Sequence, residues 1–278
     1  MPPAFRRQVT STLAKTMQPL YNEIGSTYCA TRRADPTIAR TLAGLVEVQK
    51  GRRFLDLACG TGNYTTALAS IGGEWHGCDI SDVMINQARS KSPAIDWKLS
   101  KADSLPYQSK YFDGAMCTLA IHHFPDLLKP FQEVHRVLDQ GVFALFTAFP
   151  EQMEGYWLCH YFPEMMKSSI VQMPAQTLVT AALESAGFEI EKIEPFYITN
   201  ELQDLFLYSG KDRPNQYLDS AVRANISSFA SRCSVEELSA GLERLSRDIE
   251  SGEFSKVAAS YQSTHGDYAY VVARKRRG

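Results

Sequence analysis

The sequence lacks the paired cysteines of a structural zinc site. No two of its six cysteines stand in CxxC or CxxxxC spacing: Cys29, Cys59, Cys78, Cys117, Cys159 and Cys233. Tetrahedral zinc sites are usually built from such pairs, so we expect no metal site. Three of the cysteines, at 59, 78 and 117, stand in apolar runs, where a free thiol packs as a small hydrophobe. This usage is typical of a reducing compartment.

Long apolar runs are also missing. A membrane-spanning helix needs roughly 20 consecutive apolar residues, and the chain has no such stretch. Its first residues, Met1 to Arg7, are not followed by the apolar core of a signal peptide. We therefore expect a cytoplasmic protein without a membrane span.

The chain has no excess of charge of either sign. Lysine and arginine total 29 and aspartate and glutamate 31, which gives a net charge of −2. General nucleic-acid binders carry a basic footprint, so no nucleic-acid partner is expected. The one basic run, Arg274 to Arg277, stands near the end of the chain and is typical of a solvated tail. The sequence does not indicate an oligomeric state.

From residue 54 onward, short apolar runs alternate with apolar positions at helical spacing. Strands are expected at 54–59, 74–80, 95–100, 112–120, 142–149, 188–193 and 268–273. Helices are expected at 63–71, 81–90, 127–138 and 178–186. This alternation predicts an α/β fold with a seven-stranded, mostly parallel, doubly wound sheet that helices cover on both faces.

Several segments extend this minimal sheet and predict helical cap insertions. There are two such insertions, the first at 151–175 and the second at 198–265. Two helical patterns lie within the second insertion, one from Leu218 to Phe229 and one that begins with a Ser234–Glu237 capping box. The expected division is a helical N-terminal lid at 1–50 (helical over 8–48), a core at 51–150, a cap insertion at 151–175, a core helix and strand at 176–197, a helical insertion at 198–265, and a final strand with a basic tail at 266–278.

The first insertion is rich in aromatic residues and methionine. They are Met153, Tyr156, Trp157, Tyr161, Phe162, Met165 and Met166. One interpretation is a lid over an apolar or planar ligand. The other is the ordinary packing of a cap.

A glycine-bearing loop, Asp56-Leu-Ala-Cys-Gly-Thr-Gly62, follows the first expected strand. Glycines let a backbone turn tightly and approach a ligand closely. A dinucleotide loop reads G-x-G-x-x-G and holds a pyrophosphate at the helix N-terminus. This loop has no third glycine at that spacing, and Asp56 places an anion at its mouth. An anion there disfavours a pyrophosphate and favours a cationic amino-acid group.

Two further carboxylates follow the next two strands. Asp79 ends the second strand, where a carboxylate accepts hydrogen bonds from ribose hydroxyls. Asp103 follows the third strand, where it can accept a hydrogen bond from the amino group of an adenine. Ile80 and Met84 are candidates to cover the faces of the ring.

Together these segments resemble the class I S-adenosylmethionine (SAM)-dependent methyltransferases of the UbiE-like, type 11 group, which have a Rossmann-like fold. The matching stretches are 56–62, 77–79, 102–106 and 112–126, within a resemblance over about 50–150 and the last two strands. Two departures are Ala58 at the usual first glycine, and Leu138-Asp-Gln-Gly141 in place of a Pro-Gly-Gly turn. The resemblance implies SAM as cofactor, with the floor beside its sulfonium at Thr118–Ala120. Together with the acids and apolar groups above, this gives the expected cofactor-binding residues. They are Asp56, Ala58, Gly60, Gly62, Asp79, Ile80, Met84, Ala102, Asp103, Ser104 and Leu119.

The N-terminal segment offers further cofactor contacts. Related small-molecule methyltransferases use an N-terminal tyrosine and arginine to cover SAM, and here Tyr21, Tyr28 and Arg33 are the candidates, with Arg32 close behind. Arginine suits a carboxylate because it can bind both oxygens. The alternative is that both arginines are surface residues ahead of a helix.

Candidate catalytic residues follow the fourth strand. His122 or His123 can act as a base where the acceptor is protonated at neutral pH. The alternative is that they only shape the pocket. His160 and Tyr161 are weaker candidates.

The leading hypothesis is a methyltransferase that acts on an oxygen, nitrogen or carbon of a small-molecule acceptor, which is apolar or aromatic if the first insertion covers it. The alternatives are methylation of RNA or protein, methylation of arsenite, and a SAM-binding regulator or cyclase that transfers no methyl group. A nicotinamide oxidoreductase is disfavoured by the loop.

Overall fold

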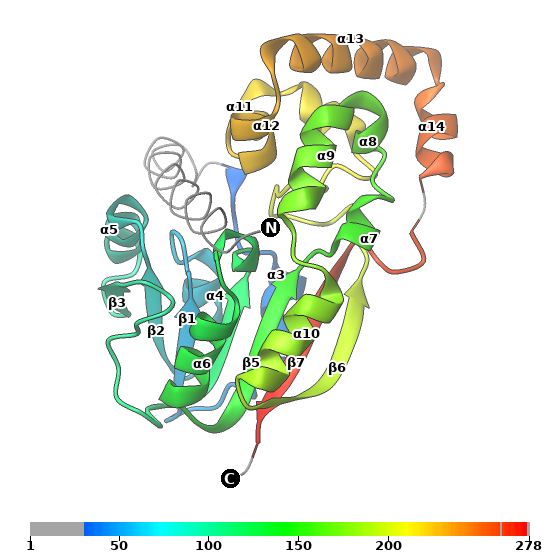
Figure 1. The fold of residues 1–278 in the computed structure, drawn as a ribbon. Coiled ribbons are helices and arrows are strands. Elements are labelled where there is room, and N and C mark those ends of the chain that lie inside the picture. Colours follow the sequence, from blue (N-terminus) through cyan, green and yellow to red (C-terminus); the bar gives the residue numbers. More distant parts are fainter. Residues whose placement is uncertain (1–30, 262, 277–278) are drawn as a thin grey trace, which may run out of the picture.

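The computed structural model describes residues 31–261 and 263–276. Its centre is a single seven-stranded sheet in the order β3-β2-β1-β4-β5-β7-β6 (Figure 1). The strands are β1 (Arg53–Leu57), β2 (Glu74–Asp79), β3 (Asp96–Leu99), β4 (Phe112–Thr118), β5 (Leu138–Thr147), β6 (Phe188–Phe196) and β7 (Tyr268–Lys275).

All neighbouring pairs among β1 to β5 are parallel, whereas β7 runs antiparallel to both β5 and β6. The last strand therefore enters the sheet between two earlier ones. Arg274 and Lys275 of the expected basic tail belong to this strand, and Arg274 pairs with Glu47 and Glu191. The predicted fold class, a mostly parallel seven-stranded α/β sheet, is confirmed.

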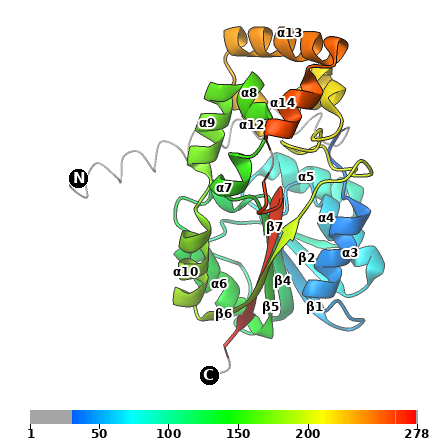
Figure 2. The same cartoon turned by 90° about the vertical axis from the view of Figure 1, so that its right-hand side faces the viewer.

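Helices cover both faces of the sheet, as Figure 2 shows edge-on. One face carries α3 (Pro36–Leu45), α4 (Asn63–Ile71) and α5 (Asp82–Lys91), and the other carries α6 (Leu128–Val137) and α10 (Gln176–Ser185). Because successive strand residues point to opposite faces, Phe54 joins one hydrophobic core while its neighbour Leu55 joins the other. Both cores are buried, which is why the strands read as continuous apolar runs.

The two insertions form a helical cap above the carboxyl ends of the parallel strands (Figure 1). The first contains α7 (Pro150–Met153), α8 (Leu158–Tyr161) and α9 (Pro163–Gln172). The second contains η2 (Pro214–Leu218), α11 (Ser220–Ala224), α12 (Ser227–Arg232), α13 (Val235–Ser251) and α14 (Phe254–Ser260). The existence of helical cap insertions is thus as predicted.

The aromatic residues of the first insertion pack inside the cap. Tyr156 stacks on Tyr208 with ring centroids 3.9 Å apart, and Trp157 meets Tyr217 edge-on at 5.4 Å. Tyr156, Trp157, Tyr161 and Phe162 are all buried. The density of the four aromatic residues reflects the joining of the two insertions, as the packing interpretation expects, whereas Met153 of the same insertion lines the cavity described below.

The helix expected from Leu218 to Phe229 is broken. Residues 220–224 form α11 and residues 227–232 form α12, with Asn225 as the C-cap of the first. The Asn225 amide donates to the carbonyl of Ala221, 3.0 Å away. Asparagine side chains compete with the backbone for such hydrogen bonds, so a helix often ends at them. The apolar spacing was correct, but the helix was not continuous.

The capping box at Ser234 is half formed. Ser234 accepts a hydrogen bond from the backbone N–H of Glu237, as expected. The Glu237 carboxylate does not return to Ser234 but accepts the N–H groups of Glu164 and Met165, at 2.8 and 3.1 Å. Glu237 therefore caps α9 and connects the two insertions.

The N-terminal helical prediction is correct for α3 and wrong for the four residues before it. Within the described residues, 32–35 are not helical, and α3 begins only at Pro36 with Asp35 as its N-cap. Proline disfavours helical geometry in the residue before it. The rest of the predicted helix, up to residue 30, lies outside the described residues.

The segment Leu138–Gly141, which stands in place of a Pro-Gly-Gly turn, forms the start of β5. A Cβ on Gly141 would lie 1.8 Å from the Asp113 carbonyl oxygen, so this position needs glycine.

Gly77 of β2 lies against the indole of Trp97, and a Cβ there would be 2.3 Å from the ring. The indole cannot move aside easily, because it is buried and donates to the Ser92 carbonyl at 2.9 Å. We predict that Gly77→Ala lowers the free energy of unfolding by about 1–3 kcal/mol through overpacking, measured by urea denaturation. Gly44→Ala in α3, with open space at its Cβ, is the control and should be neutral or stabilising. An unchanged midpoint for Gly77→Ala would contradict the packing.

Candidate functional site

The loop after β1 turns sharply through left-handed backbone. Ala58, Gly60 and Gly62 have φ values of 56°, 54° and 70°. A Cβ on Gly62 would lie 2.2 Å from the Trp97 ring, whereas one on Gly60 would have no heavy atom within 4 Å. Gly62 is thus required by the packing beneath the loop, and Gly60 leaves the backbone open to a ligand.

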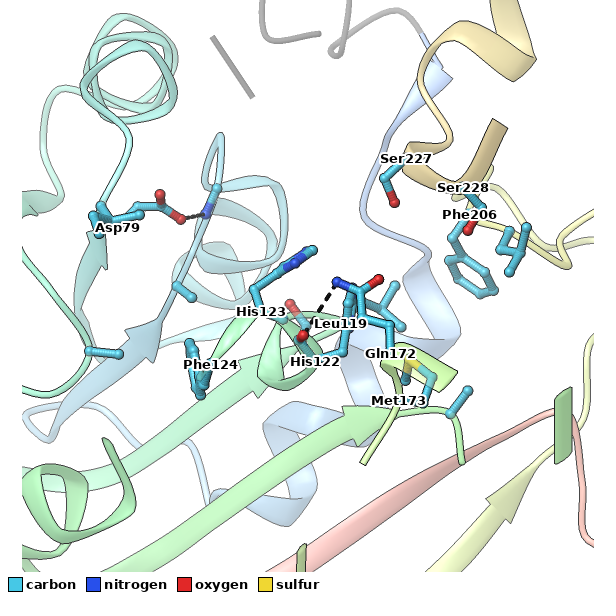
Figure 3. A pocket seen from close by; sticks show the side chains of 18 of the residues that line it. Asp79, Leu119, His122, His123, Phe124, Gln172, Met173, Phe206, Ser227 and Ser228 are labelled. Carbon is cyan, nitrogen blue, oxygen red and sulfur yellow. Dashed lines mark hydrogen bonds between the residues drawn. The ribbon is translucent and has the colours of Figure 1, made fainter. Parts of the chain in front are cut away.

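The carboxylate of Asp79 connects this loop to the next helix. Its Oδ2 accepts the N–H of Gly60 at 2.8 Å, and its Oδ1 accepts the N–H of Ser81 at 2.9 Å (Figure 3). Burial raises the pKa of Asp79, and the backbone hydrogen bonds act against that shift. Ser81 also caps α5 by accepting the N–H of Met84, so the end of β2 is held rigidly.

Asp56 lies beneath the loop and not at its mouth. It is 1% exposed, and its Oδ2 accepts the Thr65 hydroxyl at 2.6 Å. The other oxygen has no hydrogen-bond partner among the described residues. Burial raises the pKa of Asp56 to about 7. The expectation that this carboxylate faces a ligand directly is therefore corrected, because a strand residue before the turn points into the sheet's packing.

A cavity of about 1060 Å³ opens along the carboxyl ends of the strands and extends under the cap. Eight of the predicted cofactor-binding residues line it: Ala58, Gly60, Asp79, Ile80, Met84, Ala102, Asp103 and Leu119. Asp56, Gly62, Ser104 and Arg33 do not line it. Tyr21 and Tyr28 lie outside the described residues.

Arg32, and not Arg33, reaches the cavity. Arg33 is exposed, whereas Arg32 forms a two-pronged pair with Asp204, with Nε to Oδ1 at 2.5 Å and Nη2 to Oδ2 at 3.2 Å. The hydroxyl of Tyr64 donates to the same carboxylate at 3.2 Å. Asp204 is buried and comes from the second insertion. This contact, which the sequence did not predict, joins that insertion to the N-terminal segment beside the loop.

The two histidines form one wall of the cavity on η1 (Ile121–His123), directly after β4. The centroids of their rings lie 3.9 Å apart. The Gln172 amide donates a hydrogen bond to the His122 carbonyl oxygen at 3.4 Å. Burial, aided by the charge of Arg232, lowers the pKa of His122 to about 4 and also lowers that of His123. Both rings are therefore neutral at pH 7. Nδ1 of His122 has no hydrogen-bond partner within the described residues.

The cap forms the opposite wall with side chains that no sequence pattern singles out. They are Gln172, Met173, Phe206, Ser227, Ser228 and Arg232. Figure 3 shows Phe206, Ser227 and Ser228 across the cavity from Asp79, with His122 and His123 between them. His160 and Tyr161, the weaker catalytic candidates, do not line the cavity. Only the fold brings the six cap residues together, because they come from three separate segments: the end of α9, the region around Phe206, and α12.

The strand order, the loop after β1 and the carboxylate that ends β2 define the class of SAM-binding methyltransferase folds. A family model described as "Methyltransferase domain" matches residues 55–146. A solved structure titled as a putative methyltransferase from an antibiotic biosynthesis pathway of Anabaena variabilis is 31% identical, covers 87% of this chain and 98% of its own, and superposes with a TM-score of 0.78. The chain belongs to the class I SAM-dependent methyltransferases, and its cofactor is SAM.

Curated relatives are similar over the same core. A demethylmenaquinone methyltransferase of Chlorobaculum parvum is 27% identical over 58% of this chain and 75% of its own length. Another, of Bacillus pumilus, is 29% identical over 55% of this chain and 77% of its own length. The predicted family is confirmed, and the nicotinamide alternative is not supported.

None of the helices in the described residues is both long and apolar enough to cross a membrane. No group of three or more His, Cys, Asp or Glu side chains in the same part of the chain is arranged to hold a metal ion.

The pair of Arg32 and Asp204 should contribute to stability, because its side chains are only 14% and 2% exposed. We predict that Asp204→Ala costs about 3 kcal/mol, since it leaves the guanidinium without its buried carboxylate. The control is Lys192→Ala, which removes an exposed pair with Glu194 and should cost under about 1 kcal/mol. Chemical denaturation of both variants measures the difference, and equal losses would contradict this assignment.

The raised pKa of Asp56 predicts that the free energy of unfolding depends on pH. Its pKa is 3.8 when unperturbed and about 7 in the folded protein. Between these values the folded state holds a proton that the unfolded chain has released, so the free energy of unfolding falls as pH rises. Asp56→Asn removes this titration. We expect its stability relative to the parent to rise by up to about 4 kcal/mol from pH 4 to 7 and then level, followed by urea denaturation at each pH. Parallel pH profiles would refute the shift.

Proposed function

We propose that this methyltransferase acts on a small-molecule acceptor, and that one cavity holds SAM at the sheet edge and the acceptor beneath the cap. The observation that supports this most is the continuity of the space. The same cavity is lined by Gly60 and Asp79 from the sheet and by Gln172, Phe206 and Ser228 from the insertions. Concave, mostly apolar pockets are typical of sites that bind small molecules.

The residues at the sheet edge fit the cofactor. The Asp79 carboxylate lies at the end of β2, where it is placed to accept ribose hydroxyls. Ile80 is 51% exposed although it lines the cavity, and with Met84 it offers apolar cover for an adenine. Asp103 and Ala102 would lie at the adenine end, and Gly60, Ala58 and Leu119 at the methionine end. Arg32 is our candidate for the cofactor's carboxylate.

The chain's own contribution to the reaction is positioning. When bound, SAM supplies an electrophilic methyl group on a sulfonium. The His pair and Leu119, which follow β4, and the cap residues opposite them would confine the acceptor on the other side. Holding two reactants in line converts a bimolecular step into an effectively unimolecular one and excludes water.

The acceptor class that we propose is a molecule with an apolar, planar body and an oxygen function. The cavity wall includes Leu119, Phe124, Met173 and Phe206, which suit such a body. The relatives named above are demethylmenaquinone methyltransferases, and a quinone or phenol has these properties.

A base role for the histidines remains a prediction, and the environment of His122 weakens it. A phenol ionises near pH 10, while the pKa of His122 is about 4. Moving the proton between them is uphill by roughly 8 kcal/mol. We propose instead that the neutral rings shape the wall and form hydrogen bonds with the acceptor.

The assignment of Asp79 is tested by Asp79→Ala. We expect SAM affinity, measured by calorimetric titration, to fall about tenfold or more, because a hydrogen bond to a charged group contributes about 1.5–3 kcal/mol. Asp82→Ala, an exposed acid on the first turn of α5, is the matched control and should bind as the parent does.

Production of S-adenosylhomocysteine with metabolite extracts tests the activity itself. We expect the parent to produce it and Asp79→Ala to lose most of that turnover. If the parent bound NAD and not SAM, or if Asp79→Ala bound SAM unchanged, the site assignment would fail.

A further inference from the structure

The α-ammonium group of SAM needs an acceptor that Asp56 does not supply, because Asp56 lies beneath the loop and is 1% exposed. In the described part of the chain, five acids line the cavity: Asp79, Asp103, Asp126, Glu164 and Asp204. Three of them, at 103, 126 and 164, are exposed to solvent, where a charge pair contributes little. Asp79 is placed at the ribose. Asp204 is therefore the buried acid of the cavity that is left to meet the ammonium group.

Asp204 lies beside the start of α4, the helix that the glycine loop opens. Its Oδ2 accepts a hydrogen bond from the hydroxyl of Tyr64 at 3.2 Å, and Tyr64 stands in the first turn of that helix. Its partner Arg32 is held at the same place, because the amide of Asn63 donates to the Arg32 carbonyl oxygen at 2.9 Å. The carboxylate is thus positioned at the end of the cavity that we assign to the methionine part of SAM.

The Asp204 carboxylate has the capacity for one more donor. A carboxylate offers about four acceptor positions on its two oxygens. Among the described residues, Oδ2 accepts from Tyr64 and from Nη2 of Arg32, whereas Oδ1 accepts from Nε of Arg32 only. One acceptor position on Oδ1 therefore remains for a ligand.

The pair of Asp204 and Arg32 also matches the charge pattern of an amino acid. In SAM the ammonium and the carboxylate are attached to the same carbon, and the pair brings opposite charges to one place in the cavity. The two side chains are only 2% and 14% exposed, so little water screens their charges. A zwitterion can bind there without adding net charge to the buried site.

We propose that Asp204 accepts a hydrogen bond from the α-ammonium group of the cofactor, so that the second insertion supplies part of the cofactor site. This inference rests on the proposed function, in which Arg32 is the candidate for the cofactor's carboxylate. An ammonium group on the acceptor is the other source of the same chemistry, and the test distinguishes the two.

The test compares two ligands that differ only in the cofactor's amino group, each titrated calorimetrically into the parent. They are S-adenosylhomocysteine and its deaminated form, 5′-S-(3-carboxypropyl)-5′-thioadenosine. We expect the parent to bind S-adenosylhomocysteine about tenfold to hundredfold more tightly, because the deaminated ligand lacks the donor of a hydrogen bond between charged groups.

Variants identify the residue responsible. Asp204→Asn removes the charge at nearly constant size, and it should bring the two affinities within about twofold of each other by weakening S-adenosylhomocysteine alone. Asp204→Glu keeps the charge and should retain part of the preference. Asp126→Asn removes an exposed acid from the same cavity and is the matched control, which should retain all of it.

Equal binding of the two ligands by the parent would overturn the proposal, as expected if the acceptor and not the cofactor brings the ammonium group. This comparison needs no substitution, so a variant that fails to fold does not prevent the test. A preference that persists in Asp204→Asn, or an equal loss for both ligands, would also overturn it. If the parent bound neither ligand, the proposed function and its cofactor site would fail as well.

Discussion

The site depends on one constraint of the sheet, the reversal of strand order between β1 and β4. The chain builds β1, β2 and β3 outward in one direction and then returns to place β4 on the other side of β1. The loops after β1 and β4 therefore lead to opposite faces of the sheet and leave a crevice between them. Gly60 and Asp79 lie on one side of that crevice and Leu119 and His122 on the other. In the function proposed above, cofactor and acceptor meet there, where the strand order reverses.

The cap extends this crevice into a deep cavity, and the cap is held together by contacts between distant segments. Glu237 caps α9, Ser168 bonds Arg232, and Asp204 pairs with Arg32. Each of these contacts joins two parts of the chain that the sheet alone would leave apart. The cap's own core is aromatic, and Gln172 and Ser228 face the cavity beside the apolar Met173 and Phe206.

Local patterns predicted the sheet, the loop and Asp79, because strands, glycine turns and strand-end carboxylates have signals within a few residues. The same patterns could not separate Arg32 from Arg33, since only the fold determines which one meets Asp204. They placed Asp56 at the mouth of the loop, although the direction of a strand residue depends on the register of the sheet. Arg232, Phe206 and Ser228 had no signal at all, because residues this far apart along the second insertion reach one cavity only when the chain is folded. Asn225 shows the opposite case, in which a local competitor ended a helix that the apolar spacing favoured.

The most direct test of the account is a crystal structure of the protein grown with S-adenosylhomocysteine. The account predicts electron density for the ligand over the carboxyl ends of β1, β2 and β4, with its ribose at Asp79 and its amino-acid end near Gly60 and Arg32. The remaining part of the cavity, toward His122 and Arg232, should stay open to an acceptor. Density that fills the space beneath the cap instead, or a ligand bound away from Asp79, would contradict the account.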